Sequence, residues 1–536
     1  MDTPQTQPPA ALDHWGSEID VETVKGVPYR MYTQRPREMK TVLTLARRWG
    51  TRPHIIQGTR VVTFNDLLRA VAEKSRLLAD HGISRGDRAL LLGWNGPDWI
   101  INFWACQQIG AVPALANAWW SAVEVSEALD LLDPAITLAD SFGATKVPEP
   151  RRLGPWETHS IDATVSGIEA DRTVPKDEND PTVIIFTSGT AGRPKAVELS
   201  HRALLANLQM LLNLTHRLPQ DVKDDSGEVI LHTGPLFHVG GPQMLLRSLA
   251  IGNTIVLPSS RFDPAEAIDL IGKFQITRWA AVPTMVSRVL DDPTVKTKDL
   301  SSLKALTLGG APIHAELLKR IEEILPSVQA GVPTGYGLTE NCGQATAASG
   351  RDSKNHPGSA GKPLPCVELS FVPVLDAPDP EILVRSPTQM TRYVGVDESP
   401  IDAEGWLHTG DLGHLDEGGR LWITGRSKDL IIRGGENIAP MAVERALGAI
   451  AGVVESAVVG IPHPDLGEEI FAFVVVADPG LSDAYLAGQL KGHLASFAIP
   501  SVWHLQSEPL PTNQTGKVDK TALATLAREL TPRTPA

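Results

Sequence analysis

A segment rich in glycine and hydroxyl residues lies between two apolar runs at residues 183–201, VIIFTSGTAGRPKAVELSH. Gly189 and Gly192 allow positive φ and close backbone approach, so successive amide N–H groups can converge on an anion. Lys195 adds a point charge that is suited to phosphate. Further donors come from the hydroxyl groups of Thr187, Ser188 and Thr190. The segment can hold phosphate, although most clusters of this composition are ordinary loops.

A second segment, TGYGLTE at 334–340, places an aromatic residue between glycines and follows it with a hydroxyl and a carboxylate. Tyr336 can stack on a purine, and Thr339 can donate a hydrogen bond to a phosphate. Glu340 can bind Mg²⁺ through its carboxylate. Taken alone, the same residues fit a core tyrosine and a polar turn.

Three charged residues further along the chain suit the rest of a nucleotide site. Asp411 can accept hydrogen bonds from both hydroxyls of a ribose, and Arg426 is a cation at the end of an apolar run. Lys517 lies in the Gly-containing loop PTNQTGKVDK near the C-terminus. Each of these residues also has a simpler interpretation as a turn or surface residue. Only their combination with the two segments above indicates a nucleotide site.

These segments must be positioned by elements that alternate between helical and strand patterns. Helices are predicted at 63–82 and 263–275, and strands at 87–95, 276–285 and within 302–312. Such alternation predicts an α/β fold of helix-covered, parallel or mixed sheets, in which ligands bind at the carboxyl ends of the strands.

The last hundred residues have a different pattern, with several strands and short helices that form a compact α+β unit. One helix is expected at 484–497, AYLAGQLKGHLASF. The predicted division is a large N-terminal domain at 1–425, a hinge at 426–429 and a small C-terminal domain at 430–536.

Composition limits the function. The 536 residues carry a net charge of −14, which disfavours binding to nucleic acid. Three scattered cysteines predict a reducing, cytoplasmic location without disulfides. The uncharged segment 99–123 is interrupted by polar residues, glycine and proline, so it predicts a buried helix and strand instead of a membrane span.

In this order and spacing, the motifs resemble the adenylate-forming superfamily, in particular its acyl-CoA synthetases. Nonribosomal-peptide adenylation domains and firefly-type luciferases belong to the same superfamily. The resemblance implies ATP- and Mg²⁺-dependent activation of a carboxylic acid to an acyl-adenylate, followed by transfer of the acyl group to CoA. It covers nearly the whole chain, from about residue 40 to 520.

The resemblance also implies roles for the residues named above. The loop from Thr187 to Lys195 would hold the β- and γ-phosphates, Thr339 the α-phosphate, and Glu340 the metal ion. Lys517 would bridge the carboxylate and the α-phosphate as the anhydride forms. The remaining nucleotide contacts would come from Gly310, Ala311, Pro312, Tyr336, Gly337, Asp411 and Arg426.

The family's small C-terminal domain swings about a hinge residue, and Lys428 holds that position here. After the swing, Lys517 would leave the site, and the loop 433–437 with Gly434 and Gly435 would line a channel for pantetheine. One face of the domain would thus serve the first half-reaction, and another face would serve the second.

The segment PLFHVGGPQMLL at 235–246 indicates which class of carboxylic acid the protein would activate. Amino-acid-activating relatives have an aspartate after the equivalent phenylalanine, whereas Phe237 is followed here by His238. A substrate ammonium would stay unpaired, which is costly. The resemblance therefore implies a hydrophobic acid, which is fatty, alicyclic or aryl. Its predicted site comprises Phe237, His238, Gly240, Gly241, Met244, Leu245 and Gly335.

Two residues depart from the family pattern. Ala191 replaces a usual Ser or Thr, which removes about one hydrogen bond, ~1 kcal/mol, from the phosphate loop. Ala196 replaces a common glycine where a strand begins. Three alternatives stay open: a free-standing enzyme that loads a carrier protein, a luciferase-like oxygenase, and a non-enzymatic nucleotide-binding relative. The sequence leaves the acid's identity and a homodimeric state undecided.

Overall fold

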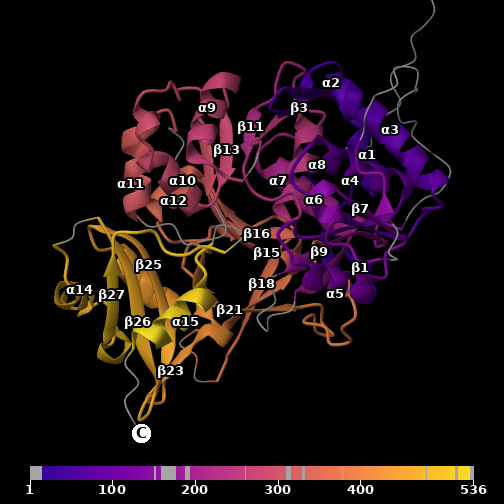
Figure 1. Cartoon of the computed structure of the whole chain (residues 1–536). Helices are drawn as coiled ribbons and strands as arrows, with labels where there is room; N and C mark the ends of the chain where they lie inside the picture. The colour runs from indigo at the N-terminus through magenta and orange to yellow at the C-terminus, as the bar shows by residue number, and fades with distance from the viewer. Residues whose placement is uncertain are drawn as a thin grey trace, which may run out of the picture.

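The computed structural model describes residues 15–149, 153–157, 177–187, 194–259, 261–308, 315–328, 332–375, 377, 379–477, 480–513 and 517–531. Helices and sheets of the N-terminal four-fifths form one large body, and the C-terminal strands and helices gather at one side of it (Figure 1). The architecture is the predicted α/β fold with a smaller C-terminal part. No helix within these ranges is long and apolar enough to span a membrane.

The first large sheet has the strand order β20-β10-β9-β6-β5-β7-β8. Its strands are β5 (Arg88–Leu92), β6 (Val112–Leu115), β7 (Ile136–Ala139), β8 (Leu153–Gly154), β9 (Pro181–Thr187), β10 (Lys195–Ser200) and β20 (Arg392–Tyr393). Strands β9, β6, β5, β7 and β8 are parallel, whereas β10 runs antiparallel to both β9 and β20. Its neighbouring helices are α3 (Phe64–Asp80), α4 (Pro97–Ile109) and α5 (Ala122–Leu132).

The uncharged segment 99–123 is divided between α4 and β6. Every residue from Trp99 to Cys106 is buried in α4, and all four residues of β6 are buried as well. The predicted buried helix and strand are therefore confirmed. A reciprocal capping box, in which Thr63 and Asp66 bond each other's backbone N–H, likewise begins α3 where the sequence places a helix.

The second large sheet has the order β14-β13-β11-β12-β3-β4. Its strands are β3 (Pro53–Gln57), β4 (Arg60–Thr63), β11 (Val229–His232), β12 (Thr254–Leu257), β13 (Arg278–Ala281) and β14 (Ala305–Leu308). Helices α9 (Pro264–Phe274), α10 (Pro283–Asp291) and α11 (Ala315–Ile324) share one core cluster with Leu231, Trp279 and Leu306 of this sheet. Residues of its opposite face, such as Ile255 and Leu257, share a cluster with α8 (Gly240–Ile251). The sheet is therefore covered on both faces.

Two smaller sheets connect the large body to the C-terminal part. One contains β15 (Thr334–Leu338), β16 (Gly343–Ala348) and β17 (Lys362–Pro363), and the other contains β18 (Glu368–Val372), β19 (Glu381–Arg385), β21 (Leu407–Leu415) and β22 (Leu421–Arg426). Short elements elsewhere are α1 (Met39–Thr44), α2 (Ala46–Trp49), α6 (Ser141–Ala144), α12 (Gly350–Asn355), η1 (Pro293–Lys296), η2 (Thr339–Asn341), η3 (Ser427–Asp429) and η4 (Ser496–Ala498).

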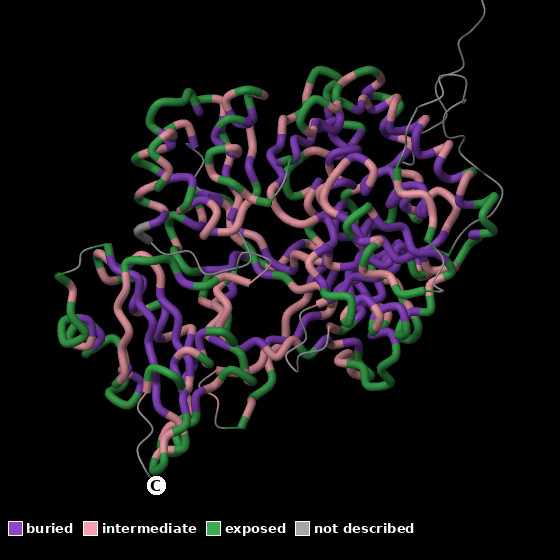
Figure 2. Tube along the Cα trace, viewed as in Figure 1, coloured by how far each residue is buried: buried purple, intermediate pink, exposed green. Residues whose placement is uncertain are grey.

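The C-terminal part is built on a sheet whose central strands are flanked by two core clusters. It comprises β23 (Ile431–Arg433), β24 (Glu436–Ile438), β25 (Val453–His463), β26 (Gly467–Val476), β27 (Val502–Gln506), α13 (Pro440–Gly448), α14 (Asp483–Leu490) and α15 (Lys520–Leu530). Val458 packs with α13 and α14, whereas Val459 packs with α15 on the other face. Buried residues accordingly follow β25 and β26 in Figure 2.

One predicted helix is wrong in length. Residues 484–497 were expected to be helical throughout, but α14 ends at Leu490. Lys491 is extended and Gly492 has a φ of +88°, so the backbone cannot continue the helix. The apolar residues that follow are Leu494, which packs against the C-terminal core, and Phe497, which is partly exposed.

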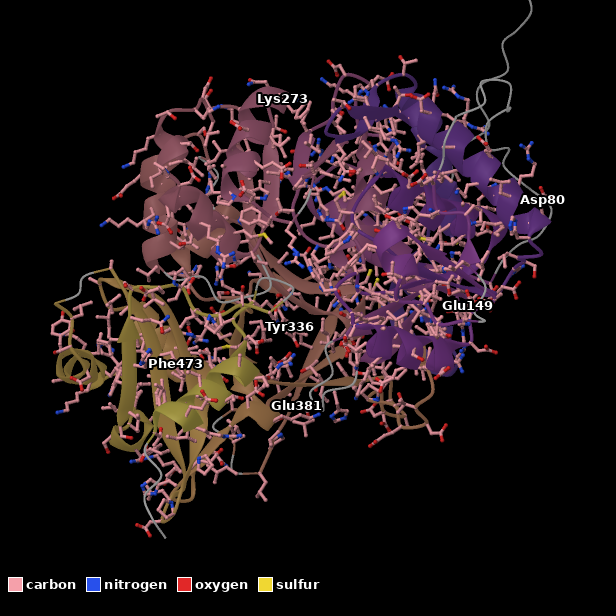
Figure 3. All side chains as sticks on the ribbon, viewed as in Figure 1. Asp80, Glu149, Lys273, Tyr336, Glu381 and Phe473 are labelled. Atoms are coloured by element: carbon pink, nitrogen blue, oxygen red, sulfur yellow. The ribbon has the colours of Figure 1, made fainter. Side chains whose placement is uncertain are left out.

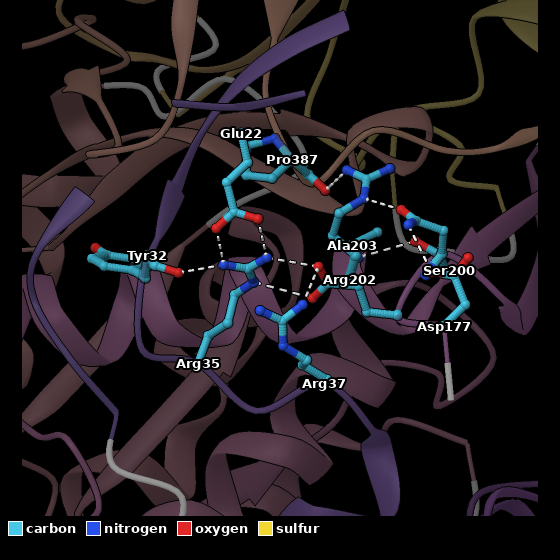
Figure 4. Close-up of polar contacts among 11 residues, drawn as sticks. Glu22, Tyr32, Arg35, Arg37, Asp177, Ser200, Arg202, Ala203 and Pro387 are labelled. Atoms are coloured by element: carbon cyan, nitrogen blue, oxygen red, sulfur yellow. Dashed lines mark hydrogen bonds and ion pairs between the residues drawn. The ribbon is translucent and has the colours of Figure 1, made fainter. Parts of the chain in front are cut away.

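An ion-pair network fastens the N-terminal hairpin of β1 (Ile19–Val24) and β2 (Val27–Tyr32) to the large body (Figure 4). The buried guanidinium of Arg35 binds Glu22 at 2.6 Å and Glu178 at 2.7 Å. Arg202 of α7 (His201–Leu214) donates to the carbonyl of Pro387. Segments far apart in the chain are thereby joined by charge-assisted hydrogen bonds.

Candidate active site

The two ends of the proposed phosphate loop lie side by side. Thr187 is the last residue of β9 and pairs in register with Lys195, the first residue of β10. The antiparallel pairing thus closes the loop at its base. Ala196 is a buried strand residue, as its position after the lysine predicts. Five predicted or discussed loop residues lie outside the described ranges: Ser188, Gly189, Thr190, Ala191 and Gly192.

Tyr393 brings the lysine of this loop close to the proposed metal ligand. The ammonium of Lys195 lies 4.5 Å from the centroid of the Tyr393 ring, within cation–π range. The hydroxyl of Tyr393 donates to Oε1 of Glu340 at 2.8 Å. Sequence reasoning missed Tyr393, because only the pairing of β20 with β10 places it here.

The carboxylate of Glu340 fits the metal that the resemblance implies. In the part of the chain that the structure describes, no group of three or more His, Cys, Asp or Glu residues is arranged so that it could hold a metal ion. Mg²⁺ is commonly bound by one or two carboxylates together with substrate phosphates and water, so it does not need such a cluster. Glu340 follows Thr339 in the 3₁₀ turn η2, immediately after β15. These residues therefore suit a magnesium–phosphate site.

Three predicted nucleotide residues form a hydrogen-bonded group. Tyr336 Oη donates to Oδ2 of Asp411 at 2.6 Å, and Arg426 Nε donates to Oδ1 at 2.6 Å. Asp411 and Arg426 are paired across β21 and β22. Asp411 is only 4% exposed, and these partners supply the hydrogen bonds that a buried carboxylate requires. In Figure 3, Tyr336 lies near the junction between the large body and the C-terminal part.

The electrostatics of this group follow from its burial. Burial, reinforced by the charge of Asp411, raises the pKa of Tyr336 well above its usual value. Burial lowers the pKa of Arg426, but its charge interaction and hydrogen bond with Asp411 outweigh that effect and raise it. Tyr336 is therefore a neutral donor, and Arg426 is a permanent cation.

Lys517 reaches this group from the C-terminal part. Burial, and then the charge of Arg426, lower the pKa of the Lys517 ammonium. Burial, and then the charge of Lys517, lower the pKa of His238 to about 4. Lys517 thus lies within electrostatic range of both residues. The backbone of its loop is closed by Asn513, whose N–H donates to the Lys517 carbonyl at 2.7 Å.

His238 precedes α8 and presents an unsatisfied atom. Its Nε2 is buried and has no hydrogen-bond partner among the residues described. Because the imidazole is neutral at pH 7, it can serve as donor or acceptor to a substrate carboxyl group. The neighbouring Phe237 is 4% exposed and packs against Trp119, with ring centroids 5.5 Å apart.

The predicted acid-site residues on α8 separate onto two faces. Gly240 is exposed, with nothing within 4 Å of a Cβ placed there, and Met244 is half-buried. Leu245 packs in the core, and a Cβ on Gly241 would meet the Leu236 carbonyl oxygen at 2.1 Å. In the structure, Gly240 and Met244 are thus accessible to a substrate, whereas Gly241 and Leu245 lie in the packed interior.

The other predicted glycines shape the neighbouring strands and a turn. A Cβ on Gly337 would lie 2.1 Å from the carbonyl oxygen of Gly343, so β15 and β16 need glycine there. Gly335 of β15 faces a similar backbone contact. Gly434 and Gly435 form the turn between β23 and β24, with φ of +61° and +87°.

Lys428 is exposed in η3, between the last strand of one sheet and the first strand of the C-terminal sheet. Its role as a hinge stays a prediction, as does the domain division at 426–429. Gly310, Ala311 and Pro312 lie outside the described residues.

Two family models match the chain. The model for AMP-binding enzymes matches residues 44–394, and the model for the C-terminal domain of AMP-binding enzymes matches residues 442–517. Together these ranges include every site residue described above except five that lie between them, which are Asp411, Arg426, Lys428, Gly434 and Gly435.

Named relatives and a solved structure agree with these models. The chain is 33% identical over 504 residues to 3-[(3aS,4S,7aS)-7a-methyl-1,5-dioxo-octahydro-1H-inden-4-yl]propanoyl:CoA ligase of Mycobacterium tuberculosis, covering 88% of this chain and 95% of the relative. It is 32% identical over 492 residues to feruloyl-CoA synthase of an Amycolatopsis species, covering 88% and 96%. O-Succinylbenzoate coenzyme A synthetase from Bacillus subtilis, in complex with ATP and magnesium ion, superposes with a TM-score of 0.73 at 28% identity, covering 89% of this chain and 97% of that one.

Proposed function

Because this chain belongs to the AMP-binding enzyme family, we propose that it joins a hydrophobic carboxylic acid to CoA and converts ATP to AMP and pyrophosphate. It is an AMP-forming acyl-CoA synthetase that uses ATP, Mg²⁺ and CoA. The finer part of the proposal concerns the acid, which is fatty, alicyclic or aryl. The observation that carries the proposed adenylation is the hydrogen-bonded Tyr336–Asp411–Arg426 group, with Lys517 within electrostatic range of Arg426 and of His238.

In the first half-reaction, a carboxylate oxygen attacks the α-phosphorus of ATP. An acyl O–P bond forms, the bond to the β-phosphate bridging oxygen breaks, and pyrophosphate leaves. Two anions must approach each other, so the ammonium of Lys517 neutralises charge between them. Lys195 and the loop that it closes hold the β- and γ-phosphates, and Asp411 accepts hydrogen bonds from the ribose. Glu340 would hold Mg²⁺, which when bound would neutralise further phosphate charge.

In the second half-reaction, the sulfur of CoA attacks the acyl carbonyl carbon. A C–S bond forms, the C–O bond to the phosphate breaks, AMP leaves, and the thiol proton passes to solvent. Lys517 must withdraw to admit the thiol, and rotation at Lys428 in η3 supplies that movement. The β23–β24 hairpin with Gly434 and Gly435 would then face the channel for pantetheine.

Features of the site support a hydrophobic acid. The first turn of α8 contains no acidic residue that could pair with an ammonium. Phe237 contacts both Trp119 and the neutral His238, and half-buried Met244 supplies further apolar surface on α8. One of the two relatives is named for an acid in which a ring system is attached to the propanoyl chain that is joined to CoA, and the other is named for the feruloyl group.

The test is pyrophosphate release with ATP and Mg²⁺ against short to long fatty acids, benzoates, cinnamates, alicyclic acids and amino acids, with and without CoA. Mass spectrometry identifies the products. A CoA-dependent thioester with one hydrophobic class supports the proposal. Adenylate without thioester would instead favour a carrier protein or oxygen as the acceptor. The cytoplasmic location and a homodimeric state stay predictions.

A further inference from the structure

A pocket of about 380 Å³ opens at the edge of the first large sheet where β5, β6 and β9 begin. Pockets that bind small molecules commonly have volumes of roughly 300–1,000 Å³. The charged side chains that line this pocket are those of Arg85, Arg88, Arg392, Asp180 and Glu198. The proposed reaction uses none of these residues.

The pocket lies at the opposite end of β9 from the proposed phosphate loop. Strands β5, β6 and β9 are parallel, so their first residues share one edge of the sheet. Pro181, the first residue of β9, lines the pocket, whereas Thr187, at the base of the phosphate loop, is the last. The seven residues of β9 span roughly 20 Å. A ligand in this pocket would therefore leave the phosphate loop unoccupied.

The pocket forms where helix α5 ceases to cover the sheet. Leu90 and Ala196 share a core cluster with the buried side chains of α5. Arg88 and Glu198 lie two positions from them along β5 and β10, so strand alternation turns them to the same face. Helix α5 ends at Leu132, whose carbonyl accepts a hydrogen bond from Nη1 of Arg88 at 2.9 Å. Beyond this point, charged side chains take the place of the apolar core.

Two of the three arginines have carboxylate partners. Nε and Nη2 of Arg392 donate to the two oxygens of Glu198 at 3.0 and 3.2 Å, and Arg85 forms an ion pair with Asp180. Arg88 has no carboxylate partner among the residues that the structure describes, and its bond to Leu132 uses neither Nε nor Nη2. Neither of these nitrogens is enclosed. Three guanidinium groups and two carboxylates thus leave one positive charge uncompensated in the pocket.

The unused edge of Arg88 has the geometry that a carboxylate requires. Nε and Nη2 of a guanidinium form a planar fork that matches the two oxygens of a carboxylate, as Arg392 and Glu198 show on the same pocket wall. One carboxylate on Arg88 would balance the remaining positive charge. A phosphate dianion would add excess negative charge beside the two acids. Val112 and Pro181 also line the pocket and provide apolar contact.

We propose that this pocket binds a small monocarboxylate, with its two oxygens on Nε and Nη2 of Arg88 and its apolar body against Val112 and Pro181. This site is separate from the proposed acid site beside His238 and does not depend on the proposed function. The carboxylate is bound there without being activated, because the phosphate loop lies at the other end of β9.

The test measures binding of benzoate, acetate and inorganic phosphate at pH 8 by isothermal titration calorimetry. Saturating α,β-methylene-ATP and Mg²⁺ occupy the nucleotide site throughout. The proteins compared are the wild type, Arg88→Gln, Arg88→Lys and the matched control Arg351→Gln, at an exposed position of α12 that does not line the pocket. Arg85→Gln alters an exposed ion pair and is a second variant that should fold. Thermal unfolding midpoints establish which variants are folded.

We expect saturable binding of benzoate to the wild type, with acetate weaker because it lacks an apolar body, and with phosphate weaker still. Arg88→Gln should weaken benzoate binding by about tenfold or more, because it removes the charge and the fork. Arg88→Lys should be intermediate, because it keeps the charge and loses the fork. Arg85→Gln should also bind benzoate more weakly, because Asp180 is then no longer neutralised, and Arg351→Gln should match the wild type.

Three results would overturn the inference. Equal benzoate binding in the wild type and in folded Arg88→Gln or Arg85→Gln would place the carboxylate elsewhere, such as in the acid site. Absence of saturable benzoate and acetate binding to the wild type would show that the pocket holds no carboxylate. Binding of phosphate that depends on Arg88 and is tighter than that of benzoate would assign the pocket to a different anion.

Discussion

The hydroxyl of Tyr336 donates a 2.6 Å hydrogen bond to Oδ2 of Asp411, an aspartate that also binds Arg426 through Oδ1. Both oxygens of a buried carboxylate thus have a protein donor before any nucleotide binds. Each oxygen keeps a second lone pair, which is what two ribose hydroxyls require. The tyrosine therefore acts as a positioning residue for Asp411, in addition to any contact that its ring makes with adenine.

Substitution of Tyr336 by Phe tests this positioning role. The ring and its packing are retained, but Asp411 loses one hydrogen bond in a buried place, which is worth about 1–3 kcal/mol. We expect KM for ATP to rise about tenfold, with a much smaller change in kcat and in KM for CoA. Initial rates with varied ATP measure this effect. An unchanged KM for ATP would show that the hydrogen bond does not prepare the ribose site.

The alkaline limit of the adenylation half-reaction depends on Lys517. Burial and the charge of Arg426 lower the pKa of its ammonium below 10.5. Because the protonated form neutralises the reacting anions, the rate should fall as pH rises through this lowered pKa. Lys517→Arg keeps its charge at every accessible pH, so its slower rate should show no such decline. Pyrophosphate release between pH 6.5 and 10.5 measures both profiles, and the same decline in the variant would assign it to another group.

The sequence predicted the parts of this molecule that depend on local pattern. The helical spacing of apolar residues at 63–82 and the polar breaks in 99–123 are visible in the chain itself. The structure confirms the helix α3 and the buried α4 and β6 that these patterns predict. The resemblance to the adenylate-forming superfamily assigned both Asp411 and Arg426 to one nucleotide site. The structure brings them together as register partners of a hairpin.

Features that depend on pairing between distant segments could not be predicted in this way. Tyr393 contacts Glu340 only because β20 joins β10 at the sheet edge. Arg88 looks like an ordinary charged residue at the start of a strand, and its place beside Arg392 depends on the pairing of segments that are far apart in the chain. Leu245 was assigned to the acid site because the resemblance makes its helix a wall of the pocket, and in the structure the helical period turns its side chain into the core.

The buried histidines make stability depend on pH. His54 stacks on Phe64 with ring centroids 4.2 Å apart, and its Nδ1 lies 3.1 Å from the carbonyl oxygen of Asn253. Burial lowers its pKa from 6.5 to about 4. Between these values the unfolded chain binds a proton that the folded chain does not. The free energy of unfolding therefore falls as pH drops through this window, by on the order of 3 kcal/mol for this group.

His54→Phe removes this titration and keeps the stacking. We expect it to be less stable than the wild type at pH 7.5, because the Asn253 carbonyl loses its donor, but to lose less stability between pH 7.5 and 5. Urea midpoints at the two pH values measure the difference. His493→Gln, at an exposed position, is the matched control and should keep the wild-type dependence. If His54→Phe and the wild type lost equal stability between pH 7.5 and 5, His54 would be excluded as a source of the pH dependence.

Two single substitutions should each impair one half-reaction and spare the other. Lys517→Ala removes the charge that adenylation needs, so pyrophosphate release should fall more than about 100-fold, which corresponds to roughly 3 kcal/mol. The same variant should still convert supplied acyl-adenylate and CoA to thioester, because the attack by sulfur does not use Lys517. Lys428→Pro stiffens the backbone of η3 and should have the opposite effect, with adenylation retained and thioester formation slowed. Both half-reactions are measured separately for each variant, with supplied acyl-adenylate for the second. An equal loss of both half-reactions in both variants would mean that one fixed arrangement of the C-terminal part serves the whole reaction.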